Sequence, residues 1–279
     1  MRLLLQHLFY GVLACAMAYG QATSSFDVAS VKPSNAGVRS SMRGGPGTSD
    51  PGQITYTNVT LFNVLLRAYN VKSYQLSAPD WMSSQRYDIA AKIPPGTSKE
   101  SFERMLQSLA AERFHLALHR ETHDLKGYDL AAGRTGPRLK ASQATDTPAV
   151  ELKGLPKTDA NGFPQLDAPG LVMMEGARGK AVVIHLTANA QPLSALVELL
   201  SKEFAMPIQD MTGLSGKFDF HLEFAPQPPG VLEAAPPADD AAPNLVTAVQ
   251  QQLGLRLNSS KVGVEVLVID RADRVPTEN

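Results

Sequence analysis

The mature part of this chain reads as one series of elements written twice, and this repetition constrains the fold more than any other feature. An apolar run at helical spacing begins at Leu61, and a strand-like triplet begins 26 residues later at Tyr87. In the second half the corresponding run begins at Leu193, and the triplet begins 25 residues later at Phe218. Each triplet precedes a second helical pattern and an alternating strand. The sequence therefore predicts an internal duplication in which each half buries a similar apolar face.

This pattern predicts an α+β protein of two related lobes, each a small, mainly antiparallel sheet with two helices. We expect the first lobe over 21–141 and the second over 171–279. Between them, 142–170 carries several prolines and no sustained period, which predicts a Pro-rich linker with one short strand near Val150. The Pro- and Ala-rich stretch 225–243 is expected to be a loop inserted between a strand and a helix of the second lobe.

Capping residues locate the predicted helices of the first lobe. A helix is expected over Leu61–Tyr69, capped by Asn58 or Thr60, because a side-chain oxygen there can accept from a free amide of the first turn. Ser98 is expected to cap the next helix, which has acidic residues in its first turns and an apolar side at helical spacing. These two helices should cover the sheet of the first lobe.

The strands after these helices are read from their alternation. Lys126-Gly127 separates a strand at Phe114 from another at Tyr128, which predicts a hairpin. The last strand is expected over Val264–Ile269, and the polar tail from Arg271 is expected to fray.

The first 20 residues have the layout of a secretory signal peptide. One charge, Arg2, precedes an apolar stretch that is too short to span a membrane, and small residues stand before Gln21. We therefore expect an exported protein that begins near Gln21 and has no transmembrane span after signal removal. The alternative is a lipoprotein in which Cys15 is acylated; otherwise Cys15 is a small apolar residue of the signal.

Cleavage before Gln21 would leave a mature chain without cysteine, and therefore without disulfides, thiolate metal sites or a thiol nucleophile. Without Arg2, 25 basic and 27 acidic side chains remain. This near balance gives no general attraction to nucleic acid or to anionic lipid, so no nucleic-acid partner is expected.

Three histidines recur at every fourth position, as His115, His119 and His123. On a helix they would share one face, but the neighbouring apolar residues alternate with period two, which predicts a strand. On a strand, residues four apart lie roughly 13 Å from each other, too far to share a metal ion. No metal site and no cofactor site is therefore predicted. His185 and His221 also occur in strand-like contexts without a partner at metal-ligand spacing.

No catalytic residues are predicted. Gly213-Leu214-Ser215-Gly216 resembles part of a nucleophile elbow, but the second glycine is misplaced and a strand follows where the elbow needs a helix, so a turn is expected. Asp88 and Asp219 occupy matching positions of the two halves. A carboxylate that recurs in both halves suggests a structural task, whereas a glycosidase dyad would more naturally be made once.

Three residues are candidate contacts for a ligand or partner. The glycine-rich loop 43–48 could present amides and the guanidinium of Arg43 to an anion, or it could be a simple hairpin loop, since it lacks a Walker A lysine. Asp80 and Trp81 follow a proline turn. Trp81, the only tryptophan, is either an anchor for a partner or a plug that closes the lobe.

Several ordered segments carry a resemblance to a known family. They include FDVASVKP at 26–33, PDW at 79–81, YDIAAK at 87–92, LAAERF at 109–114, HRET at 119–122, TGLSGKFDF at 212–220 and VLVID at 266–270. They resemble a family of exported proteins of unknown function that is expanded in acidobacteria and other soil bacteria. The resemblance covers nearly the whole mature chain and implies no catalytic residues.

A related segment is attached behind membrane-bound metallopeptidase sensors of the BlaR/MecR type. This chain has neither the HExxH motif nor the membrane helices of those sensors, so their peptidase activity is not expected here. The element order is also similar to the short N-terminal domain of secretins and TonB-dependent receptors, which works by protein contact. That similarity is an analogy of fold.

We expect a non-catalytic binding or protein-interaction module of the cell envelope, in the periplasm or outside the cell, whose partner is an unidentified envelope protein or ligand. The alternatives are a hydrolase of envelope polymers and a structural envelope protein. An apolar groove around Trp81 would favour binding, whereas buried acids and histidines that share one cleft would favour hydrolysis.

Overall fold

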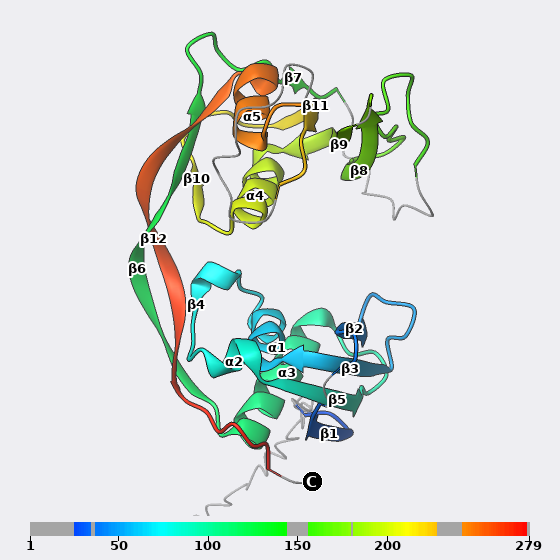
Figure 1. The fold of residues 1–279 in the computed structure, drawn as a ribbon, viewed down its shortest axis with the longest axis vertical. Coiled ribbons are helices and arrows are strands. Elements are labelled where there is room, and N and C mark those ends of the chain that lie inside the picture. The colour runs from blue at the N-terminus through cyan, green and yellow to red at the C-terminus, as the bar shows by residue number, and fades with distance from the viewer. Residues whose placement is uncertain (1–24, 35–36, 144–155, 180, 228–241, 278–279) are drawn as a thin grey trace, which may run out of the picture.

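The computed structural model describes residues 25–34, 37–143, 156–179, 181–227 and 242–277. Within them the chain forms twelve strands and five α-helices, and most strand pairs are antiparallel, so the predicted α+β class is confirmed. The strands build three four-stranded sheets. Figure 1 shows that two of the sheets belong to two separate bodies and that the third joins them.

The first body contains the sheet of order β1-β5-β3-β2, with helices packed against one face. Thr60 accepts a hydrogen bond from the Asn63 amide at 3.2 Å, and Ser98 accepts one from the Ser101 amide at 3.1 Å. The predicted caps at Thr60 and Ser98 are therefore confirmed. The elements are β1 (Val28–Pro33), β2 (Ser41–Gly44), β3 (Gln53–Thr60), α1 (Leu61–Ala68), α2 (Trp81–Ser84), β5 (Arg86–Lys92) and α3 (Lys99–Phe114).

The second body contains the sheet of order β7-β11-β9-β8 and two helices, which bury the apolar residues of β9 and β11. The Ala225 amide donates to the Pro243 carbonyl at 2.8 Å, so the two ends of the predicted loop 225–243 meet. Its middle and the predicted strand near Val150 lie outside the described residues. The elements are β7 (Lys140–Ala141), β8 (Gly170–Arg178), β9 (Ala181–Pro192), α4 (Leu193–Phe204), β11 (Lys217–Phe224) and α5 (Leu245–Leu253).

A long two-stranded ribbon, β6 (Ala117–Ala132) and β12 (Leu255–Arg271), runs along one side of the molecule from body to body (Figure 1). The short strands β10 (Ile208–Asp210) and β4 (Leu76–Ser77) pair with it in parallel, one beside each body. The ribbon therefore belongs to both bodies.

The predicted hairpin at Lys126-Gly127 is wrong, because both residues lie inside the continuous strand β6. Gly127 is instead required by a neighbour: a Cβ there would overlap the carbonyl oxygen of Pro207, which accepts a hydrogen bond from the Tyr128 amide at 3.0 Å. The glycine marks a close backbone approach and not a turn.

Each hydrophobic core takes residues from both halves of the sequence. Leu267 and Ile269 of β12 are buried in the first core, whereas Leu130 of β6 is buried in the second. The chain thus crosses between the bodies twice through the ribbon. Either body alone would therefore lack a strand that the other half of the sequence supplies.

The C-terminal segment is fastened to the first body, so the predicted fraying from Arg271 is wrong. The Asp273 amide donates to the Phe114 carbonyl at 2.7 Å, and the Thr277 amide donates to the Arg113 carbonyl at 2.8 Å. The Tyr87 hydroxyl donates to the Arg274 carbonyl at 2.7 Å. Burial raises the pKa of Tyr87 to about 12, although the nearby Arg274 acts in the opposite direction.

The same backbone feature precedes α1 and α4. Asn58 and Ala190 have φ angles of 52° and 51°, at the point where the register of β3 with β5, and of β9 with β11, is shifted. The Asp88 carboxylate accepts from the Asn58 amide at 2.8 Å, and the Asp219 carboxylate accepts from the Ala190 amide at 2.8 Å. The structural task that the sequence suggested for the two aspartates is therefore confirmed.

Candidate functional site

The three predicted contact residues lie in the first body and do not form one site. Asp80 and Trp81 begin α2, whereas Arg43 lies on β2, across the body from α2 in Figure 1. Trp81 is partly buried against the first core, and the guanidinium of Arg274 lies 5.8 Å from the centroid of its ring. This contact ties Trp81 to the C-terminal segment.

The glycine-rich loop 43–48 turns its amides inward. The Gly45 amide donates to the carbonyls of Asp50 and Gln53, both at 3.0 Å, so it is already occupied. A Cβ on Gly45 would come within 3.4 Å of Arg67 and Phe102, which form a cation–π pair at 5.3 Å. The loop closes over this pair, in agreement with the hairpin interpretation. The segment Gly213–Gly216 is an irregular stretch that leads directly into β11, so a strand and not a helix follows Ser215, as expected.

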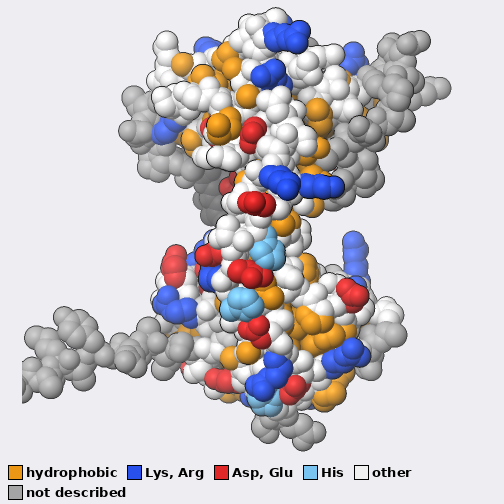
Figure 2. Space-filling model, turned by 90° about the vertical axis from the view of Figure 1, so that its left-hand side faces the viewer, with side chains coloured by type: hydrophobic (Ala, Val, Ile, Leu, Met, Phe, Trp, Pro, Cys, Tyr) orange, Lys and Arg blue, Asp and Glu red, His pale blue; other side chains and the backbone are white. Residues whose placement is uncertain are grey.

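His119 and His123 of the ribbon, and His115 just before it, each meet a carboxylate. His115 Nδ1 lies 2.7 Å from Asp273 Oδ2, His119 Nδ1 lies 2.9 Å from Asp270 Oδ1, and His123 Nε2 lies 2.6 Å from Glu121 Oε1. Figure 2 shows acids and histidines side by side along this exposed ribbon. Among the described residues, no three or more His, Cys, Asp or Glu side chains are grouped so that they could hold a metal ion.

The predicted strand position of His115 is wrong. The residue is the C-cap of α3, with a φ of 46°. The helix ends here because His115 leaves the helical conformation, and the strand begins only at Ala117. His119 and His123 do lie on a strand, as expected.

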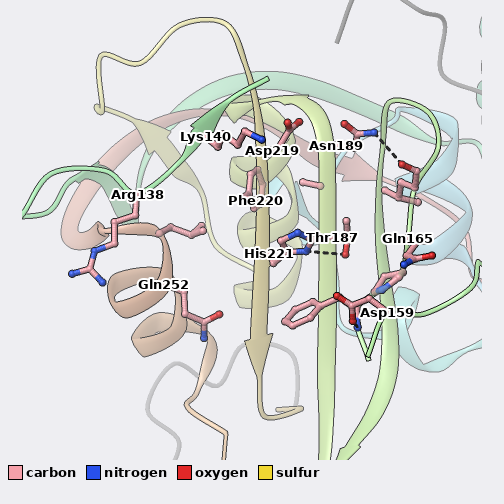
Figure 3. A pocket seen from close by; sticks show the side chains of 15 residues that line it. Arg138, Lys140, Asp159, Gln165, Thr187, Asn189, Asp219, Phe220, His221 and Gln252 are labelled. Atoms are coloured by element: carbon pink, nitrogen blue, oxygen red, sulfur yellow. Dashed lines mark hydrogen bonds between the residues drawn. The ribbon is translucent and has the colours of Figure 1, made fainter. Parts of the chain in front are cut away.

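A pocket of about 590 Å³ lies on the second body, over β9 and β11, and reaches round the edge of β11 to the C-terminal end of α5 (Figure 3). Polar side chains from five parts of the chain line it together with Phe163 and Phe220. Its charged and hydrogen-bonding residues include Arg138, Lys140, Asp159, Asn189, Asp219 and His221. Several polar groups that converge on one concave site are typical of a ligand pocket.

One wall of the pocket is the segment 156–166, which is held to the sheet through His185. His185 is only 3% exposed; its Nδ1 lies 2.9 Å from the Gly162 carbonyl and its Nε2 lies 3.0 Å from the Glu223 carboxylate. Both partners are hydrogen-bond acceptors, and each faces one ring nitrogen of His185. Arg178 Nη1 donates to the second oxygen of Glu223 at 2.8 Å.

Phe163 completes the same wall. Its ring lies 4.7 Å from the His185 ring and 5.0 Å from the His221 ring. The turn before it is fixed by Asp159, whose Oδ1 accepts from the amides of Asn161 and Phe163, both at 2.9 Å. The wall is therefore built by interactions of its own and does not depend on a ligand.

The opposite side of the pocket lies at the outer edge of β11. Lys140 of the short strand β7 is paired with Asp219. Farther along, the side-chain amide of Gln252 accepts from the Glu223 amide at 2.9 Å and donates to the Glu223 carbonyl at 2.8 Å, as a neighbouring strand would. His221 lies between these two positions and shares a hydrogen bond of 3.1 Å with Thr187. The pocket thus opens where the edge strand stops.

Sequence reasoning did not find this site. His185 and His221 were recognised only as strand residues, and the segment with Asp159 and Phe163 was treated as part of a linker. One signal was available: Phe163 is the only aromatic residue of the proline-rich stretch 142–170. An aromatic residue there indicates a segment that packs on a surface.

None of the helices in the described ranges is long and apolar enough to cross a lipid bilayer.

Comparison with known proteins gives a family but no activity. No curated protein and no solved structure matches the chain. Residues 63–272 match a family described as protein of unknown function (DUF3738), which covers more than half of the chain. The chain therefore belongs to the DUF3738 family.

Proposed function

We propose that this protein is a non-catalytic binding module that holds a polar ligand in the pocket of the second body. The supporting observation is the wall formed by 156–166, because a buried histidine, a carboxylate and an aromatic stack fix it in place without a ligand. A site that is rigid beforehand loses less conformational entropy on binding. The lining also includes polar side chains whose hydrogen-bonding capacity is only partly used within the protein.

The hydrolase alternative has one observation in its favour. Asp159, Asp219 and His221 line the same pocket, and His221 is hydrogen-bonded to the hydroxyl of Thr187. However, one oxygen of Asp159 holds a turn and one oxygen of Asp219 holds the Ala190 amide. These contacts give both carboxylates structural work, which favours binding over turnover.

A capture experiment tests the pocket. The purified protein is immobilised and exposed to envelope extract from its host, and retained proteins, glycans and small molecules are identified. We expect Gln165→Trp to abolish retention, because the exposed Gln165 lines the pocket and an indole there would fill it. Trp81→Ala, a change outside the pocket, serves as the control and should retain the same material.

Loss of retention in Trp81→Ala but not in Gln165→Trp would move the site to the first body and refute the proposal. Retained polymer that becomes shorter with time, at a rate abolished by His221→Ala, would replace it by the hydrolase alternative. A protein that retains nothing from any fraction would leave only the structural role.

We also propose that the protein is exported, in accordance with the charge, apolar stretch and small residues at its N-terminus. Intact-mass measurement of the protein from its host should give a chain that begins near Gln21. A mass that includes Met1, or one that includes a lipid on Cys15, contradicts this version.

Finally, we propose that the two bodies arose by duplication, as the repeated sequence pattern suggests. Three correspondences support this origin. First, the two sheets have equivalent strand orders, in which β1 corresponds to β7. Second, an aspartate accepts a hydrogen bond from a backbone residue with positive φ before α1 and before α4. Third, a lysine on the edge strand is paired with each aspartate, Lys32 with Asp88 and Lys140 with Asp219. Paired mutations of the two bodies should then have similar effects on stability.

A further inference from the structure

We propose that the ligand of the second-body pocket is a neutral carbohydrate chain, bound through its hydroxyl groups. This inference rests on the proposed function and specifies the class of ligand. Four properties of the pocket support it: the balance of its charges, its unused hydrogen-bonding atoms, the exposed edge of β11 and the aromatic residues in its wall.

The charges of the lining cancel. Two cationic side chains, Arg138 and Lys140, are offset by two carboxylates, Asp159 and Asp219. An anionic ligand would be attracted by the first pair and repelled by the second, and a cationic ligand would meet the reverse. A neutral polar ligand avoids both penalties.

The lining offers acceptors and donors close together. Among the described residues, no hydrogen bond engages Oδ2 of Asp159, Oδ2 of Asp219 or Oδ1 of Asn189. Donors are available on Lys140 and on the side-chain amide of Gln165. A hydroxyl donates one hydrogen bond and accepts others. A row of hydroxyls on a sugar can therefore satisfy both kinds of group.

At the outer edge of β11, the backbone groups of His221 are available for hydrogen bonds, whereas Asp219 and Glu223 on either side of it already have partners. Glu223 is bonded through both its amide and its carbonyl to Gln252, and successive residues of a strand alternate in direction. His221 is two residues before Glu223, so its amide and carbonyl point to the same side, into the pocket. Two hydroxyls on neighbouring sugar carbons can bind this amide and carbonyl together, as the amide of Gln252 does at Glu223.

The same edge argues against an extended peptide. A peptide added as a strand needs several alternate positions of the edge to be open. Here Asp219 is paired with Lys140 and Glu223 is bonded to Gln252, which leaves only His221 between them. A peptide would gain one pair of backbone hydrogen bonds and no more.

The aromatic wall supplies the apolar part of the site. Phe163 is partly buried and meets the His221 ring in an edge arrangement, with ring centroids 5.0 Å apart. One face of a pyranose ring presents C–H groups, which pack on such aromatic surfaces while the hydroxyls remain at the ring edge. Phe163 therefore orients a sugar toward β11.

Calorimetric titration with defined oligomers tests the inference. The probes are four neutral tetrasaccharides (of glucose in β- and α-linkage, of xylose and of N-acetylglucosamine), the galacturonic acid tetramer as an anion, the glucosamine tetramer as a cation and acetylated tetra-alanine as a peptide. At least one neutral tetrasaccharide should bind at one site per chain, with higher affinity than the charged oligomers and the peptide.

Two matched variants locate the binding. Asp219→Asn keeps an oxygen that can accept from Ala190 but removes the charge and replaces the other oxygen by an amide group, on a residue that lines the pocket, and it should weaken binding by about tenfold, as loss of a hydrogen bond to a charged group does. Asp88→Asn makes the same change in the first body, outside the pocket, and should leave the affinity unchanged. Equal melting temperatures of the two variants would show that folding is not the cause.

Each other outcome overturns the inference. A charged oligomer or the peptide that binds best, with the same response to Asp219→Asn, would keep the pocket as a binding site but contradict the carbohydrate. Retention of another class of material in the capture experiment, with no saccharide binding, would do the same. Saccharide binding that Asp219→Asn does not weaken would place the carbohydrate elsewhere on the protein.

Discussion

The two bodies share a sheet order and differ on the sheet face opposite the helices. In the first body Thr55 lies opposite Ala90 at this face, and both residues are exposed. In the second body the equivalent pair is Thr187 and His221, and Thr187 is only 6% exposed because the segment 156–166 covers this region. The same framework thus gives a bare face in one body and a walled pocket in the other.

The edge strands account for the rest of the difference. β1 has six residues and pairs with β5 from Tyr87 to Lys92, whereas β7 has two residues and pairs only with Phe218 and Asp219. Beyond Asp219 the outer edge of β11 is left to a glutamine side chain and the pocket. A shorter edge strand and a loop laid over the sheet therefore distinguish the body with the pocket from the body without it.

The largest expected effect tests whether the two cores are equivalent. Tyr87 is fully buried and Phe218 is 8% exposed, and each pairs with the residue that follows the backbone shift before a helix. We expect Tyr87→Ala and Phe218→Ala each to lower the free energy of unfolding by about 3–5 kcal/mol, as removal of a large core aromatic does. Urea titration followed by circular dichroism measures both. A loss below about 1 kcal/mol in one body alone would break the equivalence.

The stability of the protein at alkaline pH should depend on Tyr87 but not on Phe218. Burial raises the pKa of Tyr87 from 10.0 to about 12, so the folded state holds this proton more tightly than the unfolded state. The stability that the folded protein gains from this tighter proton binding is fully present below pH 10 and is lost as the pH rises through about 12. This gain in the free energy of unfolding is about 2–3 kcal/mol at most.

Tyr87→Phe should therefore lose less stability between pH 10 and 12 than the unaltered protein, measured by urea titration at each pH. Phe218→Leu is the control in the second body, because neither phenylalanine nor leucine titrates. Burial also raises the pKa of Tyr56, Tyr69 and Tyr74, so some alkaline loss should persist in every variant. Identical slopes with and without the Tyr87 hydroxyl would contradict this prediction.

Much of each body could be predicted from the sequence because its signals are local. The helical spacing after Leu61 and Leu193, and the cap at Ser98, depend on neighbouring residues. The continuous ribbon could not be predicted because Gly127 resembles a turn residue, and the reason for it is Pro207, a residue far away in the sequence. The pocket was missed for the same reason: His185 and Phe163 gain their roles only when a loop folds onto the sheet.

The carboxylate that fixes each backbone shift should contribute about 2 kcal/mol, since a backbone amide that donates to a charged acceptor forms one of the stronger hydrogen bonds. Asp88→Ala and Asp219→Ala should therefore destabilise the protein by similar amounts in thermal unfolding. The asparagine variants keep an acceptor oxygen and should lose less than half as much. A large effect from Asp88 with none from Asp219 would mean that the second aspartate serves the pocket alone.

The smallest expected effect distinguishes the two backbone positions themselves. Ala190 has a φ of 51°, a left-handed conformation that costs an alanine about 1–2 kcal/mol, whereas asparagine at position 58 tolerates it more readily. Ala190→Gly removes this strain, offset by the greater chain entropy of glycine and by loss of a buried methyl group, so we expect stability to stay equal or to rise by up to about 1 kcal/mol. Asn58→Gly removes the hydrogen bond from its side chain to the Val38 carbonyl and should lower stability. Differential scanning calorimetry measures the melting temperatures of the two variants. The melting temperature of Ala190→Gly should stay equal or rise, and that of Asn58→Gly should fall. Equal losses would mean that the aspartates, and not the residues they hold, set the conformation before each helix.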